Sequence, residues 1–288
     1  MNPQPPASTC YRHPDRPTGL ACTRCGRAAC PECLHPAAVG QHCVECLQQG
    51  RSDVPPARTA AGAPVAQRPV PYVTYLLIAL NVAVFAITAA QAHSITANQR
   101  SALFYDWVLG ARLVGDGEWI RVLGTGFLHY GPLHLLVNMF ALYILGRDGE
   151  MVLGRLRFTM VYLASLLGGS AAVMWLAQDS LTAGASGAIY GLFGAMAVIL
   201  LRLRQSPTQI FVLIAINLLI SVSLPNISLW GHLGGLAAGT LATTGILFAP
   251  QWLKIRTPSA ARTTGWIAVA AVVVVSLLLI GTAATQMS

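Results

Sequence analysis

The sequence predicts an all-α, polytopic membrane protein preceded by a small module that bound metal ions stabilise. Of its 288 residues, 55% are hydrophobic and only 10% are charged, whereas a soluble domain carries roughly 25% charged residues. All seven cysteines, in contrast, lie near the N-terminus, before any long apolar run begins. The chain therefore divides into a small polar module and a much larger apolar region.

Seven apolar stretches in the larger region are candidates for membrane-spanning helices. Such a helix needs about 20 apolar residues, within a range of about 17–25. A loop of about 40 residues separates the first two stretches, and long ordered loops are usually functional. We predict helices over about 72–91, 132–146, 158–177, 185–201, 209–224, 229–248 and 265–284.

The basic residues indicate which ends of these helices face the cytosol, because Lys and Arg accumulate in cytoplasmic segments beside membrane helices. With a cytosolic N-terminus, the inner segments hold Arg51, Arg58, Arg68, Arg147, Arg155, Arg157, Arg202, Arg204, Lys254, Arg256 and Arg262. The outer segments then hold only Arg100, Arg112 and Arg121. We expect a multi-pass protein of the cell membrane with a cytosolic N-terminus and an external C-terminus. The basic residues form no single patch, so we expect no nucleic-acid partner.

Polar residues recur near the outer ends of three helices that run in the same direction. His134 and Asn138 lie in the second predicted helix, Ser186 opens the fourth, and His232 lies at the start of the sixth. Polar side chains inside membrane helices are costly and usually face the bundle interior. Small residues repeat along the fourth and sixth helices, which allows close backbone approach. We therefore expect these four side chains to share one site.

The chemistry of these four side chains suits hydrolysis through a serine nucleophile. A serine needs an adjacent base, and a histidine supplies one near neutral pH. No Asp or Glu lies within the seven spans, so we predict a dyad of Ser186 and His232 without an acidic third member. The helix start at Ser186 offers backbone N–H groups to an oxyanion. Asn138 and His134 can add side-chain donors to the same oxyanion hole.

Three segments resemble the rhomboid family of intramembrane serine proteases. They are GEWIRVLGTGFLHYGPLHLLVNM over residues 117–139, GASGAIYG over 184–191 and GHLGGLAAG over 231–239. The resemblance covers roughly residues 70–250. It implies a six-helix core with a water-filled catalytic cavity that opens to the outside, and the last predicted helix would be a seventh, C-terminal one. The residues implied for the dyad and the oxyanion hole are those named above.

The resemblance also assigns supporting residues around the serine. Tyr190, one turn after the serine, would pack against the catalytic histidine and orient it, while Gly184 and Gly187 belong to the nucleophile motif. Trp119 and Arg121 fall where the family has a Trp-Arg signature, although an Ile separates them here. Their loop would lie partly in the outer leaflet of the lipid bilayer. The implied substrates are single-span membrane proteins, and the helix over 209–224 with the loop after it would be the lateral gate.

Other functions fit the sequence less well. A catalytically silent rhomboid-like protein that binds membrane clients is the alternative, but the chain retains both Ser186 and His232. A transporter that relays protons predicts inverted repeats or intramembrane acids, and the sequence shows neither. A zinc metalloprotease predicts a His-Glu-x-x-His motif, which is missing from the sequence. We therefore expect no cofactor for catalysis.

The N-terminal module has the ligand spacing of a double zinc site. Four pairs with two intervening residues supply eight ligands, enough for two tetrahedral zinc ions. The odd cysteine count and the expected cytosolic location argue against disulfides. The module resembles a B-box-like zinc finger. A cross-brace would pair Cys10, His13, Cys30 and Cys33 around one ion and Cys22, Cys25, Cys43 and Cys46 around the other. Sequential pairing is also compatible with the spacing, and His35 and His42 are spare candidates.

These observations predict four parts. Residues 1–50 form a B-box-like module with two structural zinc ions, because a chain of this size needs such links for stability. Residues 51–70, rich in Pro and Ala, form a flexible linker. Residues 71–250 form the protease core, and residues 251–288 form a C-terminal extension that contains the seventh helix. We expect the zinc module to bind a cytosolic protein partner.

Overall fold

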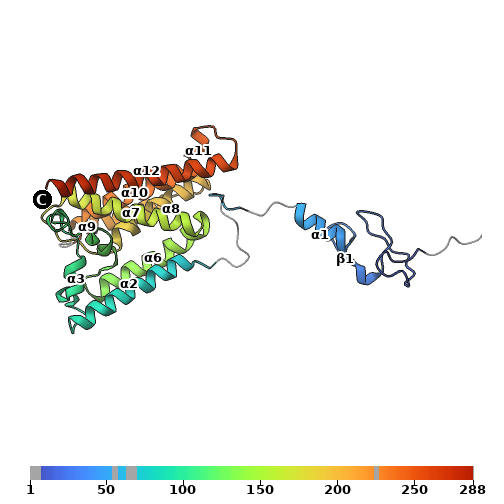
Figure 1. The fold of residues 1–288 in the computed structure, drawn as a ribbon, viewed down its shortest axis with the longest axis horizontal. Coiled ribbons are helices and arrows are strands. Elements are labelled where there is room, and N and C mark those ends of the chain that lie inside the picture. The colour runs from blue at the N-terminus through green and yellow to red at the C-terminus, as the bar shows by residue number, and fades with distance from the viewer. Residues whose placement is uncertain (1–7, 54–57, 63–69, 224–226, 288) are drawn as a thin grey trace, which may run out of the picture. The chain divides into compact units, whose positions relative to one another are not determined.

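The structure is a computed structural model that describes residues 8–53, 58–62, 70–223 and 227–287. The chain forms two compact units, Met1–Ala57 and Arg58–Ser288. Both are drawn in Figure 1. The second unit is built from long helices, which confirms the all-α architecture that the composition predicts.

The smaller unit has little regular secondary structure. A 3-10 turn, η1 (Pro31–Cys33), leads into the antiparallel strands β1 (Leu34–Pro36) and β2 (Gln41–Cys43), and α1 (Val44–Asp53) follows. The buried core of this unit consists mainly of cysteine, joined by Ala29 and Leu34. Such a core buries too little apolar surface to hold the chain by itself, so additional links between its parts are needed.

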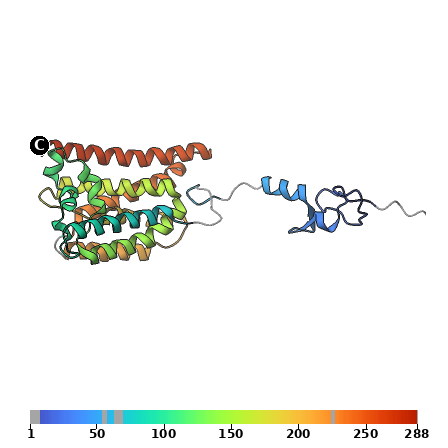
Figure 2. The same ribbon diagram turned by 60° about the horizontal axis from the view of Figure 1, so that its bottom comes forward.

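The larger unit is a bundle of long helices, visible in two orientations in Figures 1 and 2. These helices are α2 (Tyr72–Gln91), α6 (Gly131–Leu153), α7 (Arg155–Leu176), α8 (Ser186–Arg202), α9 (Thr208–Ser223), α10 (Leu229–Leu247) and α12 (Pro258–Thr285). The long loop after α2 is filled by η2 (Asn98–Arg100), α3 (Ala102–Trp107), α4 (Ala111–Gly115), α5 (Ile120–Gly124) and η3 (Thr125–Phe127). The short helix α11 (Ala249–Trp252) links α10 to α12. In both figures α12, drawn in red, lies at one edge of the bundle.

The long helices differ in how well they match a membrane span. Among the described residues, α2, α7 and α12 are each long and apolar enough to cross a membrane, and α5–η3 with α6 form a bent pair that would add a fourth span. Helices α8 and α9 are apolar but shorter. Helix α10 is rich in Gly and Thr, and it packs most extensively against α8 and α7. Its surroundings are therefore other helices more than lipid.

Glycine lets α10 approach α8 almost to backbone contact. A Cβ atom at Gly235 would lie 1.9 Å from the carbonyl oxygen of Gly187, and one at Gly239 would lie 2.4 Å from the Cα atom of Gly191. Any side chain at these α10 positions would force the two backbones apart. Because the contact begins at the first turn of α8, it brings the start of α8 next to the start of α10.

Two helix boundaries differ from those predicted. Helix α6 continues to Leu153 instead of ending near residue 146. The reason is that Glu150 is buried and accepts hydrogen bonds from the backbone N–H groups of Val73 and Thr74, at 3.1 and 2.8 Å. These contacts satisfy free donors at the start of α2. Helix α12 begins at Pro258, well before residue 265, because Thr257 and that proline form a helix start.

Part of the predicted linker belongs to the larger unit. In the segment over residues 58–62, the hydroxyl of Thr59 donates to the carbonyl of Val152 at 2.7 Å, at the end of α6. The guanidinium of Arg157, near the start of α7, donates to the carbonyl of Ala61, and this alanine is buried. These contacts hold the segment against the end of α6 and the start of α7. Residues 54–57 and 63–69 lie outside the described residues.

Candidate active site and metal sites

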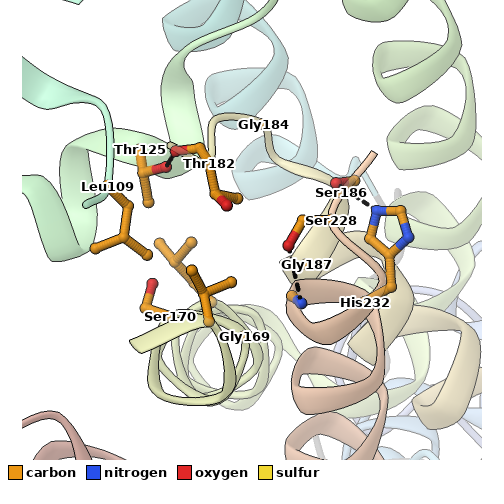
Figure 3. Close-up of a pocket in the computed structure, with 13 residues that line it drawn as sticks. Leu109, Thr125, Gly169, Ser170, Thr182, Gly184, Ser186, Gly187, Ser228 and His232 are labelled. Carbon is orange, nitrogen blue, oxygen red and sulfur yellow. Dashed lines mark hydrogen bonds between the residues drawn. The ribbon is translucent and has the colours of Figure 1, made fainter. Parts of the chain in front are cut away.

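The first turns of α8 and α10 meet at one end of the bundle and present a serine to a histidine. Ser186 is the first residue of α8, and His232 lies in the first turn of α10. The Oγ atom of Ser186 lies 2.8 Å from Nε2 of His232, and Figure 3 shows the two side chains facing each other. The structure thus brings the two predicted residues into hydrogen-bond contact, and His232 is buried.

Tyr190 covers one face of this histidine. It lies one turn after Ser186 on α8, and its ring stacks on that of His232 with centroids 4.0 Å apart and planes 9° apart. The phenol oxygen lies 3.3 Å from the hydroxyl of Ser221. The predicted neighbour of the histidine is therefore in contact with it and limits the rotation of the imidazole.

Ser221 of α9 is a neighbour of the histidine that the sequence analysis did not predict. Its Oγ atom lies 2.8 Å from Nδ1 of His232 and 2.7 Å from the carbonyl oxygen of Asn217. A serine in an apolar helix usually bonds to its own helix, so its residue type alone does not single it out. The available signal is position: the residue lies at the depth of the histidine on the preceding antiparallel helix.

His134 lies beside the serine. Its Nδ1 atom accepts a hydrogen bond from the backbone N–H of Tyr130 at 3.2 Å, so the proton of the neutral ring is on Nε2. A Cβ atom at Gly184 would lie 3.1 Å from that Nε2 and 3.4 Å from Oγ of Ser186. Asn138 lies one turn deeper, where its amide donates to the carbonyl of His134 at 2.9 Å. The imidazole of His134 and the hydroxyl of Ser186 therefore border the same space at Gly184, and the asparagine lies one turn further along α6.

The glycines of the nucleophile motif keep space around the serine. Gly184 has a φ of +140°, which disfavours any other residue, and its N–H donates to the carbonyl of Thr125 at 2.9 Å. A Cβ atom at Gly187 would lie 3.2 Å from the carbonyl oxygen of Gly231. A cavity of about 20 Å³ opens beside Ser186 (Figure 3). Its volume admits about one water molecule.

Arg121 organises the loop between α2 and α6. Its guanidinium is fully buried and pairs with the carboxylate of Glu118 at 2.5 Å. It also donates to the carbonyl of Val108 at 3.0 Å and to that of Tyr105. These bonds hold α5 against the segment around α3. The other predicted loop residue, Trp119, is 51% exposed at the start of α5.

The eight predicted metal ligands form two clusters in the smaller unit. Each cluster has four ligand atoms that lie within 4.8 Å of one another. The first cluster is Cys10, His13, Cys30 and Cys33, and the second is Cys22, Cys25, Cys43 and Cys46. This grouping is the cross-brace, in which the first ligand pair joins the third and the second joins the fourth. The two spare candidates, His35 and His42, lie opposite each other on β1 and β2, outside both clusters.

The donor atoms of both clusters fit a metal ion. In the first cluster, Nδ1 of His13 lies 3.4 Å from the sulfur atoms of both Cys30 and Cys33. All seven cysteines are free thiols. Burial raises the pKa of Cys10 and Cys22, but hydrogen bonds from backbone N–H groups outweigh it and lower both pKa values to about 6. A thiolate, the form that binds metals, is therefore available near neutral pH in each cluster, whereas burial raises the pKa of Cys33 to about 11 and that of Cys46 to about 12.

Comparisons with known proteins identify the larger unit. The sequence profile of the family described as "Rhomboid domain" matches residues 116–249. Rhomboid protease GluP of Bacillus subtilis (strain 168) is 36% identical over 192 residues, which cover 64% of this chain and 36% of the relative. Putative rhomboid protease YdcA of the same organism is 34% identical over 178 residues, which cover 59% of this chain and 86% of the relative. RHOMBOID-like protein 5 of Arabidopsis thaliana is 32% identical over 237 residues, which cover 69% of this chain and 75% of the relative.

The matches cover the relatives to different extents. The aligned part of this chain spans only about a third of GluP but most of YdcA. The family match includes Ser186, His232 and the long helices from α6 to α10, and it excludes the two metal clusters. By the similarity over most of YdcA, and by the match of its helical region to the rhomboid domain, the chain belongs to the rhomboid family.

Proposed function

We propose that this chain is an intramembrane serine endopeptidase in which Ser186 is the nucleophile and His232 is the general base. The observation that carries the proposal is the 2.8 Å contact between Oγ of the serine and Nε2 of the histidine, at the start of α8. A serine hydroxyl becomes reactive when an adjacent base accepts its proton. One relative of this chain is named a rhomboid protease and a second a putative rhomboid protease, which supports the same activity.

Each half of the reaction would use two proton transfers through the histidine. The Oγ atom of Ser186 attacks the carbonyl carbon of the substrate while its proton moves to Nε2 of His232. The carbonyl oxygen becomes an oxyanion, which free backbone N–H groups at the helix start, His134 and Asn138 can stabilise. The C–N bond then breaks, and the leaving amine takes the proton from Nε2. A water molecule hydrolyses the acyl-enzyme by the same route and restores the serine.

The expected substrate is a single-span membrane protein, cut in or near the membrane. The start of α8 lies at one end of a bundle that contains several membrane-capable helices, so a substrate segment would approach from the bilayer. The competing function is a silent rhomboid-like protein that binds membrane clients without cutting them. The contact between the serine and the histidine favours the enzyme, because a binding protein gains nothing from a paired nucleophile and base.

Reconstitution into lipid vesicles with a model single-span substrate tests the activity. The natural chain should cleave the substrate, and Ser186→Ala and His232→Ala should each abolish cleavage. Ser165→Ala is the matched control, because that buried serine bonds to its own helix at 2.7 Å, away from the histidine. Persistent cleavage by both active-site variants would exclude the dyad. Binding of the substrate without cleavage by the natural chain would favour the silent protein.

We also propose that the N-terminus is cytosolic and the C-terminus external. The starts of α7 and α12 and the end of α8 carry Arg155, Arg262 and Arg202, and such residues are enriched on the cytoplasmic side. An external C-terminus predicts that a tag placed there is digested by protease added to intact cells. Digestion only after the cells are permeabilised would reverse the proposed orientation.

For the smaller unit we propose two structural zinc ions, because four thiolate or imidazole donors at one point are typical of closed zinc sites. The purified chain should then contain two zinc ions. Cys33→Ser and Cys46→Ser should each remove one of them, since the two cysteines belong to different clusters. His42→Ala is the control and should leave both ions in place. A natural chain with well under one zinc ion would overturn this proposal. Binding of a cytosolic partner by the unit stays a prediction.

A further inference from the structure

Helix α9 packs lightly against the rest of the bundle: its side chains Ile210 and Ile214 are half-buried against the hydrophobic core. Within α9, all of which the structure describes, Ser221 is the one buried residue. The residue one turn earlier, Asn217, is partly exposed, and Ser223 is exposed. The single buried side chain of the helix is thus the hydroxyl that touches His232, at 2.8 Å. This placement calls for an explanation, since a small polar group is a poor anchor for an apolar helix.

The hydrogen bonds of this hydroxyl define the protonation of the histidine. A serine hydroxyl has one proton to donate and two lone pairs that accept. The carbonyl of Asn217 can only accept, so at 2.7 Å it takes the proton of Ser221. The two lone pairs then accept from Tyr190, at 3.3 Å, and from Nδ1 of His232. The neutral imidazole therefore carries its proton on Nδ1 and leaves Nε2 free to accept from Ser186.

We propose that Ser221 is a positioning residue, through which α9 fixes the tautomer and the orientation of His232. The inference rests on the proposed protease function and adds a residue to its machinery. The hydroxyl occupies the place that a carboxylate holds in a Ser-His-Asp triad, where the third group keeps the imidazole in the productive tautomer. Ser221 itself touches neither the nucleophile nor the cavity beside it.

This arrangement makes the reactivity of the serine depend on the position of α9. The other contacts of the histidine come from α8, through Ser186 and Tyr190, and neither residue belongs to α9. Withdrawal of α9 would remove the acceptor of the Nδ1 proton and the partner of the Tyr190 hydroxyl. The imidazole could then adopt the other tautomer, in which Nε2 carries the proton and cannot accept one from the serine.

Steady-state cleavage in lipid vesicles tests the role of Ser221. Ser221→Ala should lower kcat roughly tenfold, the rate equivalent of about one hydrogen bond, and leave KM unchanged. Ser221→Thr keeps the hydroxyl, and Ser221→Cys keeps a weaker donor and acceptor without an added carbon atom, so at least one should recover part of kcat. Ser223→Ala is the matched control, since that serine also bonds back to its own helix, at 2.8 Å, but is exposed.

A second measurement separates this proposal from the proposed protease function. A fluorophosphonate reacts when Oγ of Ser186 forms a bond to phosphorus, fluoride leaves and Nε2 of His232 accepts the proton. Its labelling rate should fall in Ser221→Ala in parallel with kcat, at an unchanged Tm. A labelling rate and a kcat of Ser221→Ala equal to those of the natural chain would overturn the proposal. So would an equal loss of Tm in all three Ser221 variants without recovery by Thr or Cys. Failure of the natural chain itself to cleave or be labelled would instead refute the protease function.

Discussion

The ring of Tyr190 lies flat against the imidazole of His232, with centroids 4.0 Å apart and planes only 9° apart. The two residues come from different helices, α8 and α10. The stack requires those helices to be in close contact, which the glycines between them permit. The phenol ring and the hydroxyl of Ser221 contact different parts of the imidazole, its face and its Nδ1 atom. Together they leave the imidazole one orientation, toward Ser186.

Replacing the tyrosine should separate the contribution of the stack from that of the hydroxyl. Tyr190→Ala removes both, and we expect cleavage to fall about two- to tenfold, because an aromatic pair contributes about 0.5–1.5 kcal/mol beyond its burial. Tyr190→Phe keeps the stack and should retain most of the activity. Initial rates of substrate cleavage measure the difference. Equal activity of the two variants would show that the stack has no part in the reaction.

Gly184 should be intolerant of substitution for two reasons. Its φ of +140° strains any other residue, and an added Cβ atom would lie 3.0 Å from the ring of His134. We expect Gly184→Ala to abolish most cleavage by displacing that ring from Ser186. Gly117→Ala is the matched control, because its φ is +100° but no atom lies within 4 Å of the added carbon. The control should cost roughly 1–2 kcal/mol of stability and keep its activity, measured at saturating substrate.

The glycine contact between α8 and α10 should dominate the stability of the larger unit. In Gly235→Ala the new carbon would lie 1.9 Å from the carbonyl oxygen of Gly187, so the helices must separate. We expect a loss of about 3 kcal/mol, at the upper end of the usual cost of overpacking. Gly281→Ala, in α12, meets open space and should keep or slightly raise Tm, because alanine is the better helix former. Thermal unfolding in detergent compares the two variants, and equal Tm values would argue against the close contact.

Glu150 should stabilise the start of α2 from the neighbouring helix. Its carboxylate accepts from two backbone N–H groups and from the hydroxyl of Thr74 at 2.9 Å. Glu150→Ala leaves these buried donors unsatisfied, and we expect it to cost about 1–3 kcal/mol. Asp148→Ala removes an exposed acid from the same helix and should change stability by less than about 0.5 kcal/mol. Thermal unfolding in detergent measures the difference. Similar effects of the two variants would show that the Glu150 carboxylate does little to stabilise the start of α2.

Much of the candidate site was predictable because its signals are local. The residues of each motif, one around Ser186 and one around His232, lie within a few positions of one another along the chain, and apolar length identifies the helices that carry them. The metal ligands were predictable for the same reason, since their two-residue gaps are visible in the sequence. In contrast, the serine at position 221 has no local signal, because its role depends entirely on which helix becomes its neighbour.

The sequence by itself determined the all-α membrane architecture, the family and the residues able to form a site, since composition, helix length and motif spacing are properties of short segments. Only the tertiary structure decided the cross-brace grouping of the cysteines, the contact of Ser221 with His232 and the burial of Glu150. Each of these depends on a partner far away along the chain. The physical reason is that a polar group takes its role from whatever donor or acceptor packing brings within about 3 Å.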